Sequence, residues 1–405
     1  MRHSLRVRRS AVVACLAVVL PLAALAQKSP KRPVLPAGAD TNDVMAYYQY
    51  GSDVLRDKPD RAAAAFYWAH RLSPDFPDAL YGAWVASLLS HRNQLPDYLN
   101  GNRGVVNSKT FRTIDSLLYG ALALNPFLYH RFDGLLFDAY ATLFAVELGS
   151  SNPAALDPGT VHFAFQRAVM SDPSMRGWLA SAEGRWDAAI DAYTSALKQE
   201  KHDASLLASR GRVAFLKGDL DAALADMTAA LAERRTTDDK DVVYFYDSKA
   251  EFEHSIGMIQ ERRHDRAAAR EAYAQALQED LSYHQAHVRL AALALADRDT
   301  ATAISEYDLA AQIQGGDPAV RYQLGTLLAA TGRCAEAVEQ FKAAIAAEPW
   351  FAPPYRALGR ALEQLQQPAE ALVQYQAFLA HARHNDPDLP GITERAEALR
   401  ASVRP

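Results

Sequence analysis

The 405-residue sequence contains little cysteine, glycine and proline, and it has no excess of positive charge. Its two cysteines, Cys15 and Cys334, are too few for a fold held together by disulfides. Forty-three basic residues against 48 acidic ones give a formal net charge of −5, which argues against nucleic acid as a partner. Glycine and proline occur only 20 times each, and the abundant alanine favours helices over turn-rich sheets. We therefore expect an all-α protein.

The first 26 residues have the pattern of an export signal. Four arginines precede an apolar stretch over 11–22, and Ala24-Leu25-Ala26 is typical of a cleavage site. The segment resembles a bacterial secretory signal peptide cleaved after Ala26, which implies a periplasmic or secreted protein without integral membrane insertion after cleavage. A lipidated Cys15 or an uncleaved anchor is less favoured, because Cys15 lies early in the stretch and the stretch is too short to span a bilayer.

The segment after the cleavage site, 27–42, combines three prolines with lysines and small polar residues. Such a composition is typical of a tether and not of a packed element. The sequence therefore predicts a flexible linker over 27–42. Once Cys15 is removed with the signal peptide, Cys334 has no cysteine to pair with, so stability must come from packing.

The body of the chain repeats with a period of 34 residues. The segments 204–235, 318–349 and 352–383 align without gaps, and one unit carries an insertion around 234–243. A small residue recurs in the first helix of each unit, at Gly177, Gly211, Gly257, Ala291, Gly325 and Gly359. An aromatic residue or methionine recurs in the second helix, at Tyr193, Met227, Tyr273, Tyr307, Phe341 and Tyr375.

This pattern resembles the tetratricopeptide repeat family, whose small and aromatic positions recur at the same period. The resemblance covers about 174–383, which we interpret as the regular array, although the closing proline and the tryptophan position of the family are mostly replaced. It implies an all-α, right-handed superhelical solenoid of antiparallel helix pairs. Small residues let the two helices of a pair approach closely, and the aromatic residue fills the adjoining gap.

The ends of the chain follow the repeat pattern less closely. Over 43–173 we expect divergent repeats of the same kind, interrupted by polar loops at 90–112 and 147–160. Over 384–405 we expect a capping helix, formed by 392–403, and a tail.

A search for catalytic motifs finds no glycine-rich phosphate loop, no nucleophile elbow and no zinc-protease helix. We predict no catalytic residues, no cofactor and no metal site. Two histidine pairs have metal-ligand spacing, His284 with His287 and His381 with His384, but packing or helix-end positions explain them. Cys334 lies where the two helices of a unit pack and needs no redox role.

In proteins that this sequence resembles, ligands bind the concave face formed by the first helices. Adding 34 to each position predicts the rows that line this face, with an apolar middle and charged ends. Arg356 and Arg360 are one turn apart and suit a carboxylate, although solvation of the last turn explains them equally well. The predicted groove residues are Arg212, Phe215, His254, Tyr322, Arg356 and Arg360.

We accordingly expect a non-enzymatic scaffold of the bacterial envelope that binds a segment of another protein in its concave groove. The alternative is an envelope enzyme or a carbohydrate-binding protein that uses the early loops. Self-association through the open edges of the array is a third hypothesis. The loop residues suited to sugar contact are Asp97, Tyr98, Asn100, Asn102 and Arg103.

Overall fold

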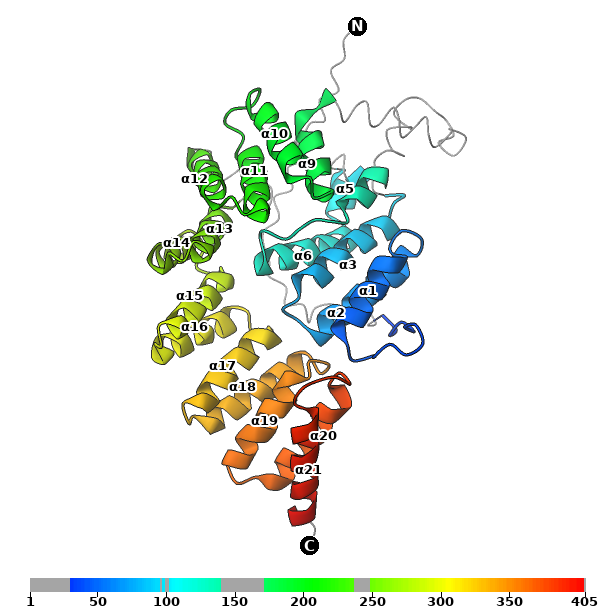
Figure 1. Cartoon of the computed structure of the whole chain (residues 1–405), viewed down its shortest axis with the longest axis vertical. Coiled ribbons are helices and arrows are strands. Elements are labelled where there is room, and N and C mark those ends of the chain that lie inside the picture. The colour runs from blue at the N-terminus through cyan, green and yellow to red at the C-terminus, as the bar shows by residue number, and fades with distance from the viewer. Residues whose placement is uncertain (1–29, 95–96, 99–101, 140–170, 237–247, 404–405) are drawn as a thin grey trace. The chain divides into compact units, whose positions relative to one another are not determined.

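The computed structural model describes residues 30–94, 97–98, 102–139, 171–236 and 248–403 (Figure 1). These residues form helices joined by short turns, and no strand occurs among them. None of the helices in these ranges has both the length and the apolar content that a bilayer-spanning helix requires.

Several sequence predictions concern residues outside this description. The predicted signal peptide, Cys15, Asn100 and the loop at 147–160 all lie there, as does most of the insertion around 234–243.

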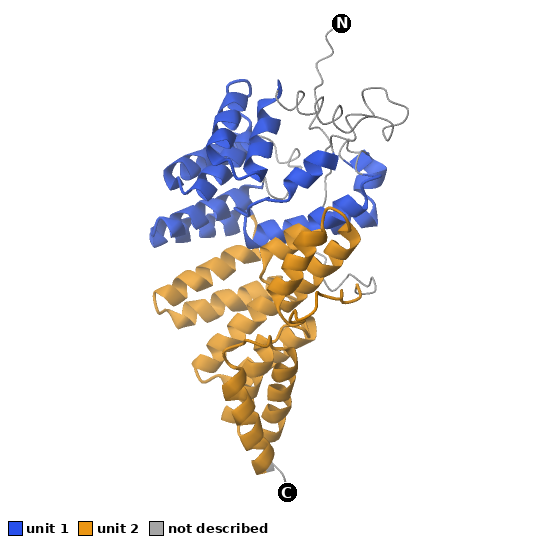
Figure 2. Cartoon of the chain, turned by 45° about the vertical axis from the view of Figure 1, so that its right-hand side comes forward, with its two compact units in different colours: residues 1–18, 84–279 blue, residues 19–83, 280–405 orange. Residues whose placement is uncertain are grey.

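The described residues divide into two compact units (Figure 2). Unit 1 contains those between 84 and 279, and unit 2 contains those of 30–83 and 280–403. Unit 2 therefore joins the first part of the described chain to the last. The helix α3 (Pro77–Ser90) contains the boundary at 83.

Unit 1 is a series of helices in which each packs on the next from α9 to α14. Alanine, leucine and aromatic side chains of neighbouring helices share one buried core. The helices of this unit are α5 (Arg103–Val106), α6 (Lys109–Leu124), α9 (Pro173–Ala182), α10 (Trp186–Leu197), α11 (Ala204–Lys217), α12 (Leu220–Thr236), α13 (Lys249–Arg262) and α14 (Arg266–Glu279).

Unit 2 contains one early helix pair and a second series, in which each helix from α15 to α21 packs on the next. The early pair is α1 (Val44–Val54) and α2 (Pro59–Leu72), which pack on each other. The later helices are α15 (His284–Ala296), α16 (Thr300–Ile313), α17 (Pro318–Ala330), α18 (Cys334–Ala347), α19 (Pro353–Gln364), α20 (Pro368–His381) and α21 (Leu389–Val403).

The small residue and the aromatic residue of four helix pairs meet as the period predicts, at Gly177, Gly257, Gly325 and Gly359. A Cβ atom built on Gly257 would lie 2.4 Å from the Tyr273 ring, and one built on Gly325 would lie 2.7 Å from the Phe341 ring. Such distances leave no room for a methyl group at these glycines unless the ring shifts. The early pair uses the same contact, because a Cβ on Gly51 would lie 3.0 Å from the ring of Phe66.

The turn between the two helices of each repeat also recurs with the period. One residue there adopts a positive φ, which for a residue with a side chain costs free energy and for glycine does not. Asp299 follows this turn and begins α16 by accepting hydrogen bonds from the first helical turn, and Asp203 and Asp317 begin the first helices of two pairs in the same way. The positive-φ residues are Gly184, Gly218, His264, Arg298, Gly332 and Gln366.

The all-α repeat fold expected from the sequence is confirmed. Three local expectations differ from the structure. Residues 30–42 were expected to be a flexible linker, whereas they lie against folded parts of unit 2 through the hydrogen bonds described below. The loop expected at 90–112 includes α5 and the first turn of α6. The last helix begins at Leu389, earlier than expected, because the proline in its first turn is compatible with helix.

Candidate functional site

The guanidinium groups of Arg356 and Arg360 lie together on α19, as their one-turn spacing predicts. Both form ion pairs with the carboxylate of Asp388, and the Arg360 Nη2 lies 3.4 Å from its Oδ1. The Arg356 side chain is 20% exposed and also lies over the Phe378 ring, whereas that of Arg360 is 57% exposed. The pair therefore holds a carboxylate, and that carboxylate comes from the chain itself.

Asp388 immediately precedes α21, which packs on α20 through Ile392, Ala396 and Leu399. An open pocket of about 380 Å³ lies here, lined by Arg360, Asp388 and neighbouring side chains of α19, α20 and α21. The predicted capping segment 384–405 thus contributes directly to the surroundings of the predicted arginine pair.

A second ion pair also lines this pocket. Arg395 donates to both carboxylate oxygens of Glu363, with Nε–Oε2 and Nη2–Oε2 distances of 2.8 and 2.6 Å. These hydrogen bonds hold the pKa of Glu363 below its ordinary value. Burial, together with the neighbouring Glu363, raises the pKa of the Tyr375 hydroxyl above its ordinary value. The pocket is therefore lined by two arginines, two carboxylates and the uncharged hydroxyl of Tyr375.

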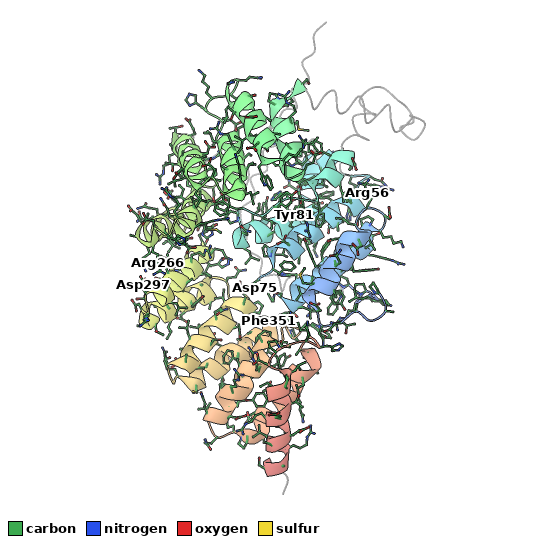
Figure 3. All side chains as sticks on the ribbon, in the orientation of Figure 1. Arg56, Asp75, Tyr81, Arg266, Asp297 and Phe351 are labelled. Atoms are coloured by element: carbon green, nitrogen blue, oxygen red, sulfur yellow. The ribbon has the colours of Figure 1, made fainter. Side chains whose placement is uncertain are left out.

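Tyr322, the third predicted groove residue of unit 2, packs its ring against aromatic neighbours. Its centroid lies 5.6 Å from that of Phe351 in an edge-on arrangement and 6.1 Å from that of Phe341. Phe351, labelled in Figure 3, lies in the turn between α18 and α19. Tyr322 consequently contributes to the packing between successive repeats, and only part of its side chain is accessible to solvent.

The three predicted groove residues of unit 1 make contacts within the same unit. Phe215 stacks on Phe127, which follows α6, with ring centroids 3.8 Å apart. His254 is 1% exposed. Arg212 lies 3.5 Å from the carboxylate of the buried Glu251, which also accepts a hydrogen bond from Ser255. Phe127 therefore covers Phe215, His254 is inaccessible to solvent, and Arg212, whose side chain is 21% exposed, is engaged by Glu251.

Three of the early loop residues proposed for sugar contact, Asp97, Tyr98 and Asn102, contact other residues of the chain. The Tyr98 hydroxyl donates to Asp115 at 2.5 Å, and its ring stacks on that of Phe111 with centroids 4.7 Å apart. Asn102 caps α5 through the N–H of Gly104 and donates to Asp97. The hydrogen-bonding groups of Tyr98 and Asn102 are thus engaged within the chain.

Neither histidine pair forms a metal site with its neighbours. His287 Nδ1 lies 2.7 Å from Glu306, and His284 Nε2 lies 3.0 Å from the side-chain amide of Gln285. The ring of His381 stacks on Tyr355. Within the part of the chain that the structure describes, no three histidine, cysteine, aspartate or glutamate side chains gather as metal ligands.

A cluster of aromatic and charged side chains in unit 2 was not predicted. The guanidinium of Arg32 lies 5.4 Å from the ring centroid of Tyr47, 5.0 Å from that of Trp68 and 4.8 Å from that of Trp350. We call these three rings the aromatic cage. Beside it, Arg71 Nε donates to both carboxylate oxygens of Glu348 at 3.1 and 2.9 Å. No periodicity connects these positions, so the sequence contained no signal that pairs them.

Comparison with protein families gives two matches. The tetratricopeptide repeat family matches residues 174–239 and 255–318. The bacterial transcriptional activator domain matches residues 319–385, which correspond to α17 to α20 and contain the same glycine–aromatic contacts. None of the curated proteins compared with the chain matches it significantly.

Several solved structures show weak similarity. YrrB, described as a TPR protein with an unusual peptide-binding site, is 19% identical with a TM-score of 0.40, over 51% of this chain and all (100%) of that one. The C-terminal part of a TPR repeat-containing protein from Cytophaga hutchinsonii is 15% identical with a TM-score of 0.43, over 56% of this chain and 84% of that one. Yeast Tom70 is 13% identical with a TM-score of 0.39, over 89% of both chains.

These structural similarities are too weak to support a functional argument. The family match is independent of them, and it covers four helix pairs that have the recurring turn, two of which also have the glycine–aromatic contact. On this evidence the part of the chain over 174–239 and 255–318 consists of tetratricopeptide repeats.

Proposed function

We propose that this chain is a non-enzymatic scaffold, exported to the bacterial envelope by its first 26 residues, that binds a segment of another protein. Tetratricopeptide repeats build protein-interaction scaffolds, which supports the general class. The single observation that carries the binding proposal is the arginine pair of α19, whose two guanidinium groups meet on one carboxylate. An acidic side chain of the partner binds this pair.

The chemistry of the pair supports an acidic partner. Guanidinium groups form directional, charge-assisted hydrogen bonds with carboxylates, and two of them together select for this group over neutral ones. Arg360 keeps much of its side chain exposed, so a second carboxylate can reach it from solvent. Asp388 therefore acts as an internal competitor, and the partner gains access as Asp388 moves aside or shares the site.

Two substitutions of opposite effect test this proposal. Arg356→Glu with Arg360→Glu places negative charge where the partner's carboxylate binds, and we expect at least about a tenfold loss of affinity. Asp388→Asn removes the competing charge, and we expect affinity to rise about three- to tenfold. The measurement is capture from an envelope extract, followed by titration of the captured protein against each purified variant.

Arg333→Glu serves as the matched control, since Arg333 is an exposed arginine of the same unit that pairs with the neighbouring Glu336. It should leave the affinity unchanged. If the double variant binds the partner as well as the unaltered chain does, α19 is not the partner surface. If Asp388→Asn weakens binding, Asp388 supports the site and does not compete for it.

A further inference from the structure

The segment 30–42, which we call the N-terminal strap, is held against unit 2 although it contains no helix or strand. The carbonyl of Pro30 accepts a hydrogen bond from the Trp68 ring nitrogen at 3.0 Å. At the other end, the Asn42 side-chain amide donates to the carbonyls of Ala380 and Ala382, both at 3.1 Å. The strap therefore connects the early pair, α1 and α2, to the end of α20.

The end of α20 offers backbone groups that need partners. The last carbonyl groups of a helix accept no hydrogen bond within the helix and need donors from other parts of the chain or from water. Asn42 supplies donors to two of them, and the Asp40 carboxylate accepts the N–H of His384 at 2.6 Å. Residues about 340 positions away in the chain thus provide the cap of this helix.

Arg32 is the central contact of the strap. Its guanidinium lies within 5.4 Å of all three rings of the aromatic cage, and its Nε donates to the Tyr47 hydroxyl at 2.7 Å. Its Nη2 donates to the Thr41 carbonyl within the strap. Two rings of the cage belong to α1 and α2, and the third, Trp350, follows α18. One cation therefore joins both parts of unit 2.

The surroundings of the cage favour a planar cation. Arg71 also lies near Trp68, at 5.2 Å from the ring centroid, but Glu348 neutralises its charge. Guanidinium groups stack on aromatic faces while their N–H groups remain free for in-plane hydrogen bonds, which an ammonium group cannot reproduce. The three prolines of the strap restrict its unbound conformations, which reduces the entropy lost when it binds.

We propose that the aromatic cage, together with the end of α20, is a binding surface for an extended, arginine-bearing peptide, and that its occupant is the chain's own N-terminal strap. Arg32 is its anchoring residue. The strap is exchangeable: it dissociates and rebinds without unfolding the helices on either side, because it belongs to no helix and contacts them through single side chains and backbone atoms. This inference does not depend on the proposed partner site of α19.

The first test is hydrogen exchange of the whole chain, read by mass spectrometry on peptides from the strap and α1. Arg32→Ala should raise exchange in these peptides roughly tenfold, as expected for the loss of several cation–π contacts. Arg32→Lys should give an intermediate rate, because it keeps the charge and loses the planar group. The matched control is Lys31→Ala, which removes the adjacent exposed cation and should change nothing.

The second test supplies the strap in trans. A synthetic peptide of residues 28–43 is added in millimolar excess to the whole chain carrying Arg32→Ala and Asn42→Ala, and it should restore protection of α1. The same peptide with Arg32→Ala should not. Millimolar excess is required because the weakened strap still competes at about millimolar effective concentration.

Four results would overturn the inference. In the first, the strap of the unaltered chain exchanges at the unprotected rate; in the second, Lys31→Ala and Arg32→Ala have equal effects. In the third, the peptide restores no protection. In the fourth, protection appears only as the protein concentration rises and the mass becomes dimeric. The last would assign the surface to the strap of a second copy. A double-mutant cycle with Trp350→Ala adds a readout that general destabilisation would not produce, since the two effects should be strongly non-additive.

Discussion

Replacing Gly325 with valine should lower the free energy of unfolding of unit 2 by about 3 kcal/mol. The added Cβ would lie 2.7 Å from the Phe341 ring, whose 1% exposure leaves it no free space to enter. The ring and the helix must shift, and the shift spreads to the next pair because the same core continues through it. Urea unfolding followed by circular dichroism measures the change.

Two further variants separate steric conflict from the general effect of valine in a helix. Gly391 also lies in a helix of unit 2, but nothing lies within 4 Å of a Cβ built on it, so Gly391→Val should be nearly neutral. Phe341→Leu should recover part of the loss when combined with Gly325→Val. At the corresponding positions of the preceding helix pair, Ala291 and Tyr307 are both buried in the same core, so this array accommodates a methyl group there. Additive costs for Gly325→Val and Phe341→Leu would contradict the proposed contact.

Acidification should destabilise unit 2 between pH 6.5 and 4. Burial lowers the pKa of His70 and of His284 from 6.5 to about 4. In this range the unfolded chain binds protons that the folded chain excludes, so stability is complete above pH 6.5 and falls as the pH approaches 4. From pH 7 to pH 4.5 each histidine should remove about 2 to 3 kcal/mol. The buried Asp317 opposes this trend, since burial raises its pKa.

The measurement is the free energy of unfolding against pH for the unaltered chain, His70→Gln and His284→Gln. Each variant should flatten the dependence on pH, whatever its effect at pH 7, and a parallel curve would exclude the histidine as a cause. Unit 1 provides a contrast, because burial raises the pKa of Asp115 to about 6. Its protonation should add stability to unit 1 as the pH falls through 6, which hydrogen exchange can resolve unit by unit.

The repeat fold could be predicted because its determinants are local. Gly325 and Phe341 belong to one repeat, and the same pair of residue types recurs at the same spacing along the array. Each unit packs mainly on its sequence neighbours, so a single sequence contains the information for the helices, their turns and their core. The arginine pair of α19 was predictable for the same reason, since one helical turn separates its members.

The surfaces of the repeats depend on contacts that no periodicity encodes. Phe127 covers Phe215, Asp388 occupies the arginine pair, and Arg32 reaches Trp350. In each case one partner comes from an irregular segment outside the regular array, and its position is set by the path of the chain.

The sequence by itself therefore determined the helix pairs, their period and their core, because these depend on packing between residues close in the chain. Only the tertiary structure decided which faces remain open. The entropy cost of closing a long loop changes slowly with loop length. Contacts between many different pairs of distant residues therefore cost similar entropy, and specific side-chain interactions decide which contact forms. In this protein Asp388 and Arg32 make that selection in unit 2, through the charge and the planar geometry of their groups.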